Sequence, residues 1–162
     1  MFKKIFFIIF LLSIFVMQDS FSQELRPANK IVLDSLKKAN TGKVIFFNYW
    51  ASWCKPCVEE FPDILKLNKE FKNKDFKLVF ISLDFGEDID TRTRKFLSKM
   101  NVDFVTYYNG FEKDEDLIND MDKNWNGGIP GTFIFDKTGN LKKTFIGKTL
   151  YKDFKTAVKN LM

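Results

Sequence analysis

An uncharged segment followed at once by two cysteines constrains the fold more than any other part of the chain. Residues 44–50 read VIFFNYW, β-branched and aromatic residues that are typical of a strand buried on both faces. Cys54 and Cys57 come directly after this strand, and apolar residues at helical spacing predict a helix over residues 56–71. The two cysteines therefore lie where a buried strand passes into a helix.

Strands and helices alternate along the rest of the chain. The patterns predict helices over residues 29–39, 89–100, 112–125 and 151–161, strands over 76–83 and 102–107, and a hairpin formed by 132–136 and 141–146. This order predicts an α/β fold in which helices flank a mixed central β-sheet. Because the sequence contains no repeat and no Pro/Gly-rich linker, we expect a single domain after the N-terminal segment.

The N-terminal segment has the three parts of a secretory signal. Residues 1–22 contain two early lysines, an uncharged run over 5–17 and small polar residues before the predicted cleavage point after Ser22. The alternative is an uncleaved membrane anchor, but the uncharged run is shorter than the ~20 residues that span a bilayer. The predicted organisation is a signal peptide over 1–22 and one domain over 23–162, exported to the periplasm.

The charge of the exported part is mildly basic. The whole chain has a net charge of +5, and removal of residues 1–22 leaves 24 basic and 20 acidic residues, a net charge of +4. The lysines are scattered along the sequence, which favours a soluble, evenly charged surface over a binding site for nucleic acid or membrane. We therefore expect no nucleic-acid partner.

Most metal and haem functions of the cysteine pair are disfavoured by the rest of the sequence. A zinc site requires four ligands, and the chain contains no histidine and no third cysteine. Covalent haem attachment requires a histidine after the second cysteine, where this chain has Val58. A copper carrier with two thiolates remains open, although such sites commonly recruit imidazole. We expect no metal and no cofactor at this site.

A structural disulfide and a redox-active pair remain. A bridge between Cys54 and Cys57 closes a very small loop, so it stabilises the fold little. In an exported protein such a pair is usually oxidised for part of its working life. At the N-terminus of a helix, unpaired N–H groups and the helix dipole favour a thiolate on Cys54, and Lys55 adds a cation. Cys57, one turn inside the helix, is placed to resolve a mixed disulfide on Cys54.

The segment VIFFNYWASWCKPCVEEFP resembles the active-site region of the thioredoxin superfamily, and within it the TlpA/ResA-like extracytoplasmic thiol-disulfide oxidoreductases. Trp53 matches the family tryptophan before the first cysteine. Residues 126–136, NGGIPGTFIFD, resemble the family segment that contains a cis-proline, which implies a cis bond between Ile129 and Pro130 close to the disulfide. The resemblance implies a thioredoxin-like fold with an extra strand and helix inserted within residues 71–110.

Two polar residues resemble the TlpA/ResA-like group in particular. These proteins commonly have an asparagine where this chain has Asn48, and a glutamate three residues after the second cysteine, which here is Glu60. Cys57 and Glu60 share one face of the predicted helix, and that face points inward with Ile64. A carboxyl group in such a place has a raised pKa, and Glu60 is predicted to take the proton from Cys57.

The resemblance implies that the protein reduces disulfides of envelope proteins through Cys54 and Cys57, with cytochrome c maturation as one setting. Trp53, Ile129 and Pro130 are the implied substrate-binding residues. Its partners would be protein disulfides or thiols, and an integral-membrane thiol carrier would supply electrons. A monomer is expected.

Two other functions stay open at this point. A peroxiredoxin-type peroxidase shares the fold, but it requires Thr or Ser three residues before the reactive cysteine, where this chain has Ala51. A non-catalytic thioredoxin-like binding module would use the surface around Cys54 without chemistry. Trp125, beside the predicted cis-proline, either belongs to the core or lines the groove for the partner.

Overall fold

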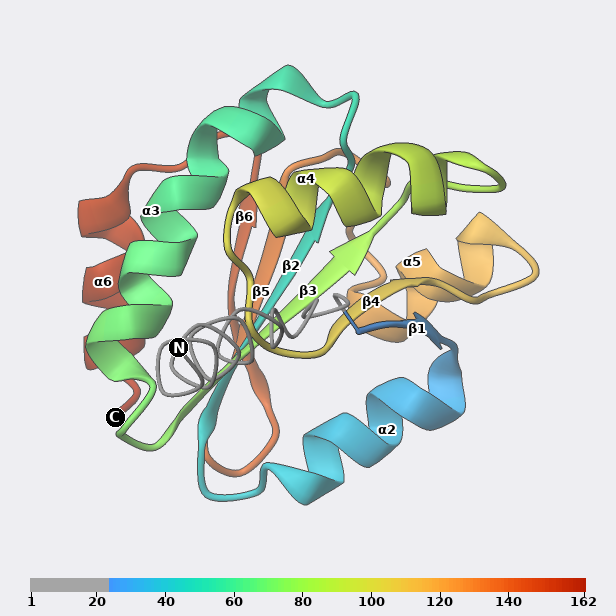
Figure 1. The fold of residues 1–162 in the computed structure, drawn as a ribbon. Helices are drawn as coiled ribbons and strands as arrows, with labels where there is room; N and C mark the ends of the chain where they lie inside the picture. The colour runs from blue at the N-terminus through green and yellow to red at the C-terminus, as the bar shows by residue number, and fades with distance from the viewer. Residues whose placement is uncertain (1–23) are drawn as a thin grey trace, which may run out of the picture.

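One mixed β-sheet organises the structure, a computed structural model that describes residues 24–162 (Figure 1). The strands are β1 (Leu25–Ala28), β2 (Val44–Trp50), β3 (Phe76–Ser82), β4 (Thr106–Asn109), β5 (Gly131–Phe135) and β6 (Leu141–Ile146). They lie in the order β1-β4-β3-β2-β5-β6, with β2 parallel to β3 and antiparallel to β5. The predicted α/β class with a mixed sheet is confirmed, whereas the predicted signal peptide lies outside the described residues.

Helices cover both faces of this sheet. They are α2 (Lys30–Ala39), α3 (Lys55–Phe71), α4 (Arg94–Lys99), α5 (Asp114–Met121) and α6 (Tyr151–Lys159), with a π-helical segment, η2 (Ile89–Thr93), before α4. Buried residues of α3, α4 and α6 join the core on one face, and those of α2 and α5 join the core on the other. Within residues 24–162, no helix combines the length and the apolar character that crossing a bilayer requires.

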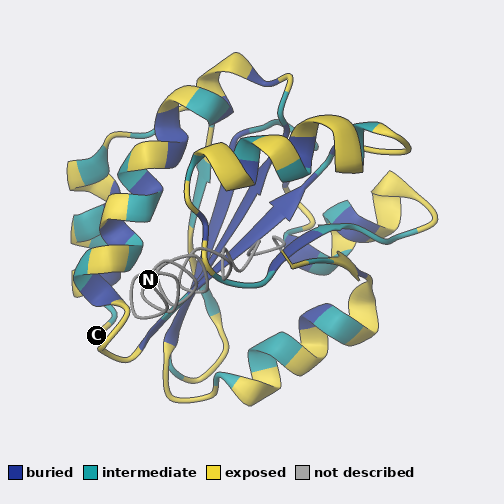
Figure 2. Ribbon diagram, in the orientation of Figure 1, coloured by how far each residue is buried: buried dark blue, intermediate teal, exposed yellow. Residues whose placement is uncertain are grey.

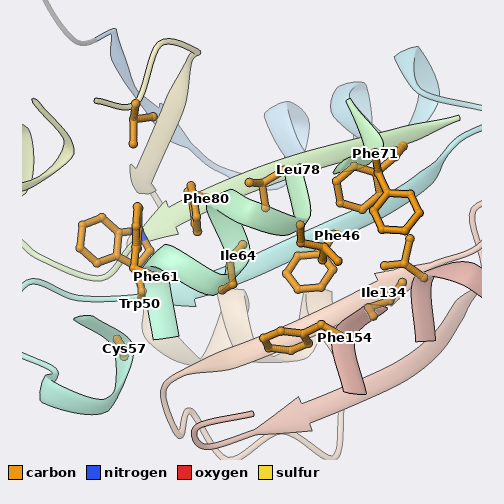
Figure 3. Close-up of a cluster of buried hydrophobic side chains, with 14 of the residues drawn as sticks. Phe46, Trp50, Cys57, Phe61, Ile64, Phe71, Leu78, Phe80, Ile134 and Phe154 are labelled. Carbon is orange, nitrogen blue, oxygen red and sulfur yellow. The ribbon is translucent and has the colours of Figure 1, made fainter. Parts of the chain in front are cut away.

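Strand β2 supplies side chains to both cores because alternate residues of a strand point to opposite faces. All seven of its residues are buried, and the central strands are the darkest part of Figure 2. On the α3 face, the ring of Phe61 stacks on that of Phe80 at a centroid distance of 4.1 Å and packs against Trp50 at 4.9 Å (Figure 3). These contacts fix the start of α3, and with it the cysteines, against the middle of the sheet.

The predicted insertion is present as η2, α4 and β4. Strand β4 pairs in parallel with both β3 and β1, so it adds one strand between them. The helix predicted over residues 89–100 begins as a π-helix, and the strand predicted over 102–107 lies further along, at Thr106–Asn109. Strand β1, at the edge of the sheet, was not predicted.

Candidate active site

Cys54 and Cys57 form a disulfide at the N-terminus of α3. Their Cα atoms are 5.2 Å apart, and both side chains are largely buried, with 6% of Cys54 and 2% of Cys57 exposed. Cys54 is the N-cap of α3, and its Sγ accepts a hydrogen bond from the N–H of Cys57 at 3.3 Å. An anionic sulfur at this position is stabilised by the same N–H group and by the helix dipole.

The turn that carries Cys54 is closed by its own backbone. The N–H of Cys54 donates to the carbonyl oxygen of Ala51 at 3.1 Å, and the carbonyl of Cys54 accepts from Val58 at 3.0 Å. Lys55, the first residue of α3, is exposed, so its charge acts on Cys54 mainly through solvent. The backbone, more than Lys55, therefore sets the environment of the reactive sulfur.

Glu60 is buried beside the pair, one helical turn beyond Cys57. Only 2% of its surface is exposed, and its Oε2 accepts from the N–H of Thr149 at 2.7 Å. Asn48 Nδ2 donates to Thr132 Oγ1 at 2.9 Å and lies 3.4 Å from Glu60 Oε1. Burial raises the pKa of Glu60 from 4.5 to about 7, and the hydrogen bonds from Thr149 and Asn48 oppose this in part. The predicted rise in pKa is confirmed.

The neighbouring Glu59 is exposed at the surface of the helix. Its carboxylate pairs with Lys148 at 2.7 Å, and both side chains are exposed. This ion pair lowers the pKa of Glu59. Glu60 is therefore the one of the two carboxylates that can exchange a proton near neutral pH.

The peptide bond between Ile129 and Pro130 is cis, as predicted. Ile129 packs against the core that contains the two cysteines, and Pro130 is buried. Within residues 24–162, the backbone N–H and C=O of Ile129 have no hydrogen-bond partner.

A groove of about 600 Å³ lies between Trp53 and the cis-proline loop. Its apolar wall includes Trp53, Leu83, Phe85, Phe111, Ile118 and Ile129. Trp53 is 57% exposed and Phe85 is 77% exposed, so two large apolar side chains of this wall face solvent. A second hollow of about 430 Å³, between β6 and α6, contains none of the predicted site residues.

Trp125 belongs to both the core and the groove. It is buried, packs against Tyr49 and Phe133, and also lines the groove. Its Nε1–H donates to the carbonyl of Gly128 at 2.9 Å. This bond holds the loop that leads into the cis-proline.

Two residues of the site were missed by sequence reasoning. Thr149 lies far along the chain, and no local pattern relates it to Glu60. Asp84 lies two residues after the end of β3, is buried, and accepts hydrogen bonds from Ser52 in the turn before Cys54. The sequence does offer one indication of Asp84: a carboxylate that closely follows a buried strand parallel to β2 lies at the same edge of the sheet as the cysteines. In residues 24–162, no group of three or more His, Cys, Asp or Glu is arranged to hold a metal ion.

Two known proteins with related sequences are named as thiol-disulfide oxidoreductases. The thiol-disulfide oxidoreductase ResA of Bacillus thuringiensis (strain Al Hakam) is 29% identical over 119 residues, which are 74% of this chain and 61% of ResA. ResA of Bacillus subtilis (strain 168) is 26% identical over 148 residues, 90% of this chain and 72% of the relative. The match with the first relative thus spans about three fifths of that protein's length.

A solved structure and a family model complete the comparison. The crystal structure of a thiol:disulfide interchange protein, a thioredoxin family protein from Chlorobium tepidum TLS, superposes with a TM-score of 0.64. The alignment has 23% identity and covers 77% of this chain and 83% of that chain, which confirms the thioredoxin-like fold. The family model described as Redoxin matches residues 23–161. The chain therefore belongs to the Redoxin family of the thioredoxin superfamily.

Proposed function

We propose that this protein is a thiol-disulfide oxidoreductase that reduces disulfides of exported proteins. The observation that carries the proposal is the position of the Cys54–Cys57 pair at the N-terminus of α3, with the buried carboxyl group of Glu60 one turn away. The first cysteine has the backbone donors that favour a nucleophile, and the second has a proton acceptor nearby. The names of the ResA relatives support the same activity.

The proposed reaction has two exchange steps and starts from the dithiol form. The thiolate of Cys54 attacks one sulfur of the partner disulfide, forms a mixed disulfide and releases the partner's other sulfur as a thiolate. Glu60 then takes the proton from Cys57, and the Cys57 thiolate attacks Cys54 Sγ. The partner's second sulfur leaves, so the partner gains two electrons and the protein returns to its disulfide form.

The groove beside the disulfide is the proposed docking site for the partner. Ile129 offers its N–H and C=O to an extended segment, in the way that a strand adds to the edge of a sheet. Trp53 and Phe85 would cover apolar side chains of that segment. Pro130, by its burial next to Ile129, would fix the position of this backbone.

The cellular setting is also a proposal. Cleavage after Ser22 would release residues 23–162 into the periplasm, where an integral-membrane thiol carrier would return electrons to Cys54 and Cys57. Cytochrome c maturation, which the resemblance to the TlpA/ResA-like group implies, is one such setting. The protein is proposed to act as a monomer.

Trapping of the mixed disulfide tests the proposed function. Replacement of Cys57 by Ser removes the resolving sulfur, so we expect partner proteins to remain linked to Cys54 and to be released by dithiothreitol. The matched control is Cys54→Ser, which should trap far less. If neither variant yields complexes that a reductant dissociates, and the native protein does not reduce insulin with dithiothreitol, the protein is a binding module and the proposal is wrong.

A further inference from the structure

The carboxylate of Asp84 is buried without a basic partner in the described part of the chain. Only 2% of the residue is exposed, and in residues 24–162 its side chain makes no salt bridge. Burial of a carboxylate destabilises the folded state unless hydrogen bonds replace the lost hydration. The hydrogen-bond donors to Asp84 therefore indicate which parts of the chain this carboxylate holds together.

The donors to Asp84 come from three segments of the chain. Ser52 donates from its N–H, at 2.9 Å to Oδ2 and 3.2 Å to Oδ1, and from its hydroxyl, at 2.9 Å to Oδ1. The hydroxyl groups of Ser82 and Thr93 donate to Oδ2 at 2.7 and 2.6 Å. Ser82 Oγ also accepts from the N–H of Asp84 at 3.1 Å, so its own hydrogen is directed at the carboxylate. The carboxylate oxygens thus accept hydrogen bonds from Ser52, Ser82 and Thr93.

Ser52 is the link between Asp84 and the cysteines. It lies inside the turn closed by the hydrogen bond from Cys54 N–H to Ala51 O, so its position determines where Cys54 begins α3. Strand β2 is fastened to β3 just before this turn, because Leu83 N–H donates to Trp50 O at 2.7 Å. The hydrogen bonds from Ser52 to Asp84 connect the turn itself to the segment that follows β3.

We propose that Asp84 is a positioning residue for the redox pair. It holds the turn at Ser52 so that Cys54 stays within bonding distance of Cys57 in the disulfide form, and its negative charge disfavours the thiolates of the reduced form. Both effects stabilise the disulfide relative to the dithiol. The inference rests on the proposed function, since it concerns the equilibrium of that same pair.

Equilibration with glutathione tests the role of Asp84. In this reaction the protein disulfide and two glutathione thiols exchange to give the protein dithiol and one glutathione disulfide, and a maleimide gel shift measures the ratio. For Asp84→Asn we expect the reduced form to be favoured three- to tenfold more than in the native protein, and tenfold is ~30 mV for a two-electron couple. Asp84→Glu keeps the charge but displaces the carboxylate, so a shift in the same direction isolates the positioning effect.

A second hydrogen-bonded carboxylate, which unlike Asp84 also pairs with Lys142 at 3.2 Å, provides a control away from the cysteines. Asp136 accepts from Thr138 N–H at 2.9 Å, Thr138 Oγ1 at 2.7 Å and Asn140 N–H at 3.0 Å in the β5–β6 hairpin. This hairpin adjoins the start of β2, since Phe135 pairs with Ile45, and is therefore at the opposite end of the strand from the cysteines. Asp136→Asn should weaken the fold locally and leave the glutathione equilibrium unchanged.

The outcomes separate this inference from the proposed function. If the native protein forms no reversible disulfide, the proposed function fails first. If the native protein equilibrates but Asp84→Asn and Asp84→Glu match it, Asp84 is only structural and the inference is overturned. Should both variants fail to fold, Ser52→Ala decides, because it removes one donor from the turn; a shift of about twofold supports the role, and no shift overturns it.

Discussion

The protonation of Glu60 is set by its burial against β2, and its pKa of about 7 gives a kinetic prediction. As a base, Glu60 must be ionised to take the proton from Cys57, so the rate of the resolving step should rise with pH around 7. In Glu60→Gln this rise should disappear and leave only the titration of the thiols at higher pH. Stopped-flow measurement of both exchange steps between pH 5 and 9 checks this.

The first exchange step is the internal control for Glu60→Gln. It depends on Cys54, so its pH profile should change less than that of the second step. Identical profiles for the native and Gln proteins in the second step would contradict the role as proton acceptor.

The same raised pKa predicts how stability depends on pH. Folding raises the pKa of Glu60 from its ordinary value of 4.5 to about 7, so the folded protein holds this proton more tightly than the unfolded chain does. The resulting contribution to the free energy of unfolding is full below pH 4.5 and is lost as pH rises through about 7. Glu60→Gln stays neutral, so between pH 5 and 8 the native protein should lose on the order of 2 kcal/mol relative to the variant. Urea unfolding of the oxidised proteins measures this, and a native protein that gains stability relative to Gln would refute it.

At the residue scale, the sequence predicted what helical spacing determines and missed what only folding brings together. Glu60 was found because it lies three residues after Cys57 on the same helix. Asp84 and Thr149 are separated from their partners by 32 and 89 positions along the chain, and their bonds depend on the sheet order and on the loop before α6.

Among the elements, α3 carries both cysteines, and Phe61 anchors it to the sheet. Phe61 is fully buried between Trp50 and Phe80, so Phe61→Ala should lower the free energy of unfolding by ~3–5 kcal/mol through lost burial and a cavity. Phe61→Leu fills much of the same space and should lose less. Urea unfolding measures the free energy of unfolding of both variants. Equal decreases for Phe61→Ala and Phe61→Leu would mean that the ring contacts do not anchor the helix.

The elements that sequence predicted well are those with a continuous apolar pattern. Residues 44–50 are a strand as predicted because every side chain is buried. Strand β1 was missed because it is four residues long, contains Pro27 and pairs only at the edge with β4. The strand predicted over 102–107 began too early, because Val102 is buried by packing into the core and not by pairing.

At the scale of the whole molecule, the charges around the disulfide predict the direction of the reaction. Lys55 is exposed, so it favours the reduced form by about 1 kcal/mol or less, roughly 20 mV for a two-electron couple. The buried carboxyl of Glu60 next to Cys57 acts in the opposite sense when ionised, since it disfavours a second anion. We therefore expect a reductant with a potential nearer that of thioredoxin, ~−270 mV, than that of DsbA, ~−120 mV.

Equilibration of the native protein with glutathione measures this potential. A value above about −180 mV, typical of protein disulfide isomerase, would mean that the protein donates disulfides instead of removing them.

The place of β2 between β3 and β5 also determines which parts of the molecule open most readily. Amides in the middle of a buried sheet exchange their hydrogens only when much of the fold opens, whereas loops and edge strands open locally at little free energy. The disulfide follows β2, a central strand whose amides we expect to exchange slowly, while Phe85 and the loop before Ile129 belong to segments outside the strands. Local opening of the loops that line the groove can therefore admit partner segments of different shape, while the two sulfur atoms keep their geometry.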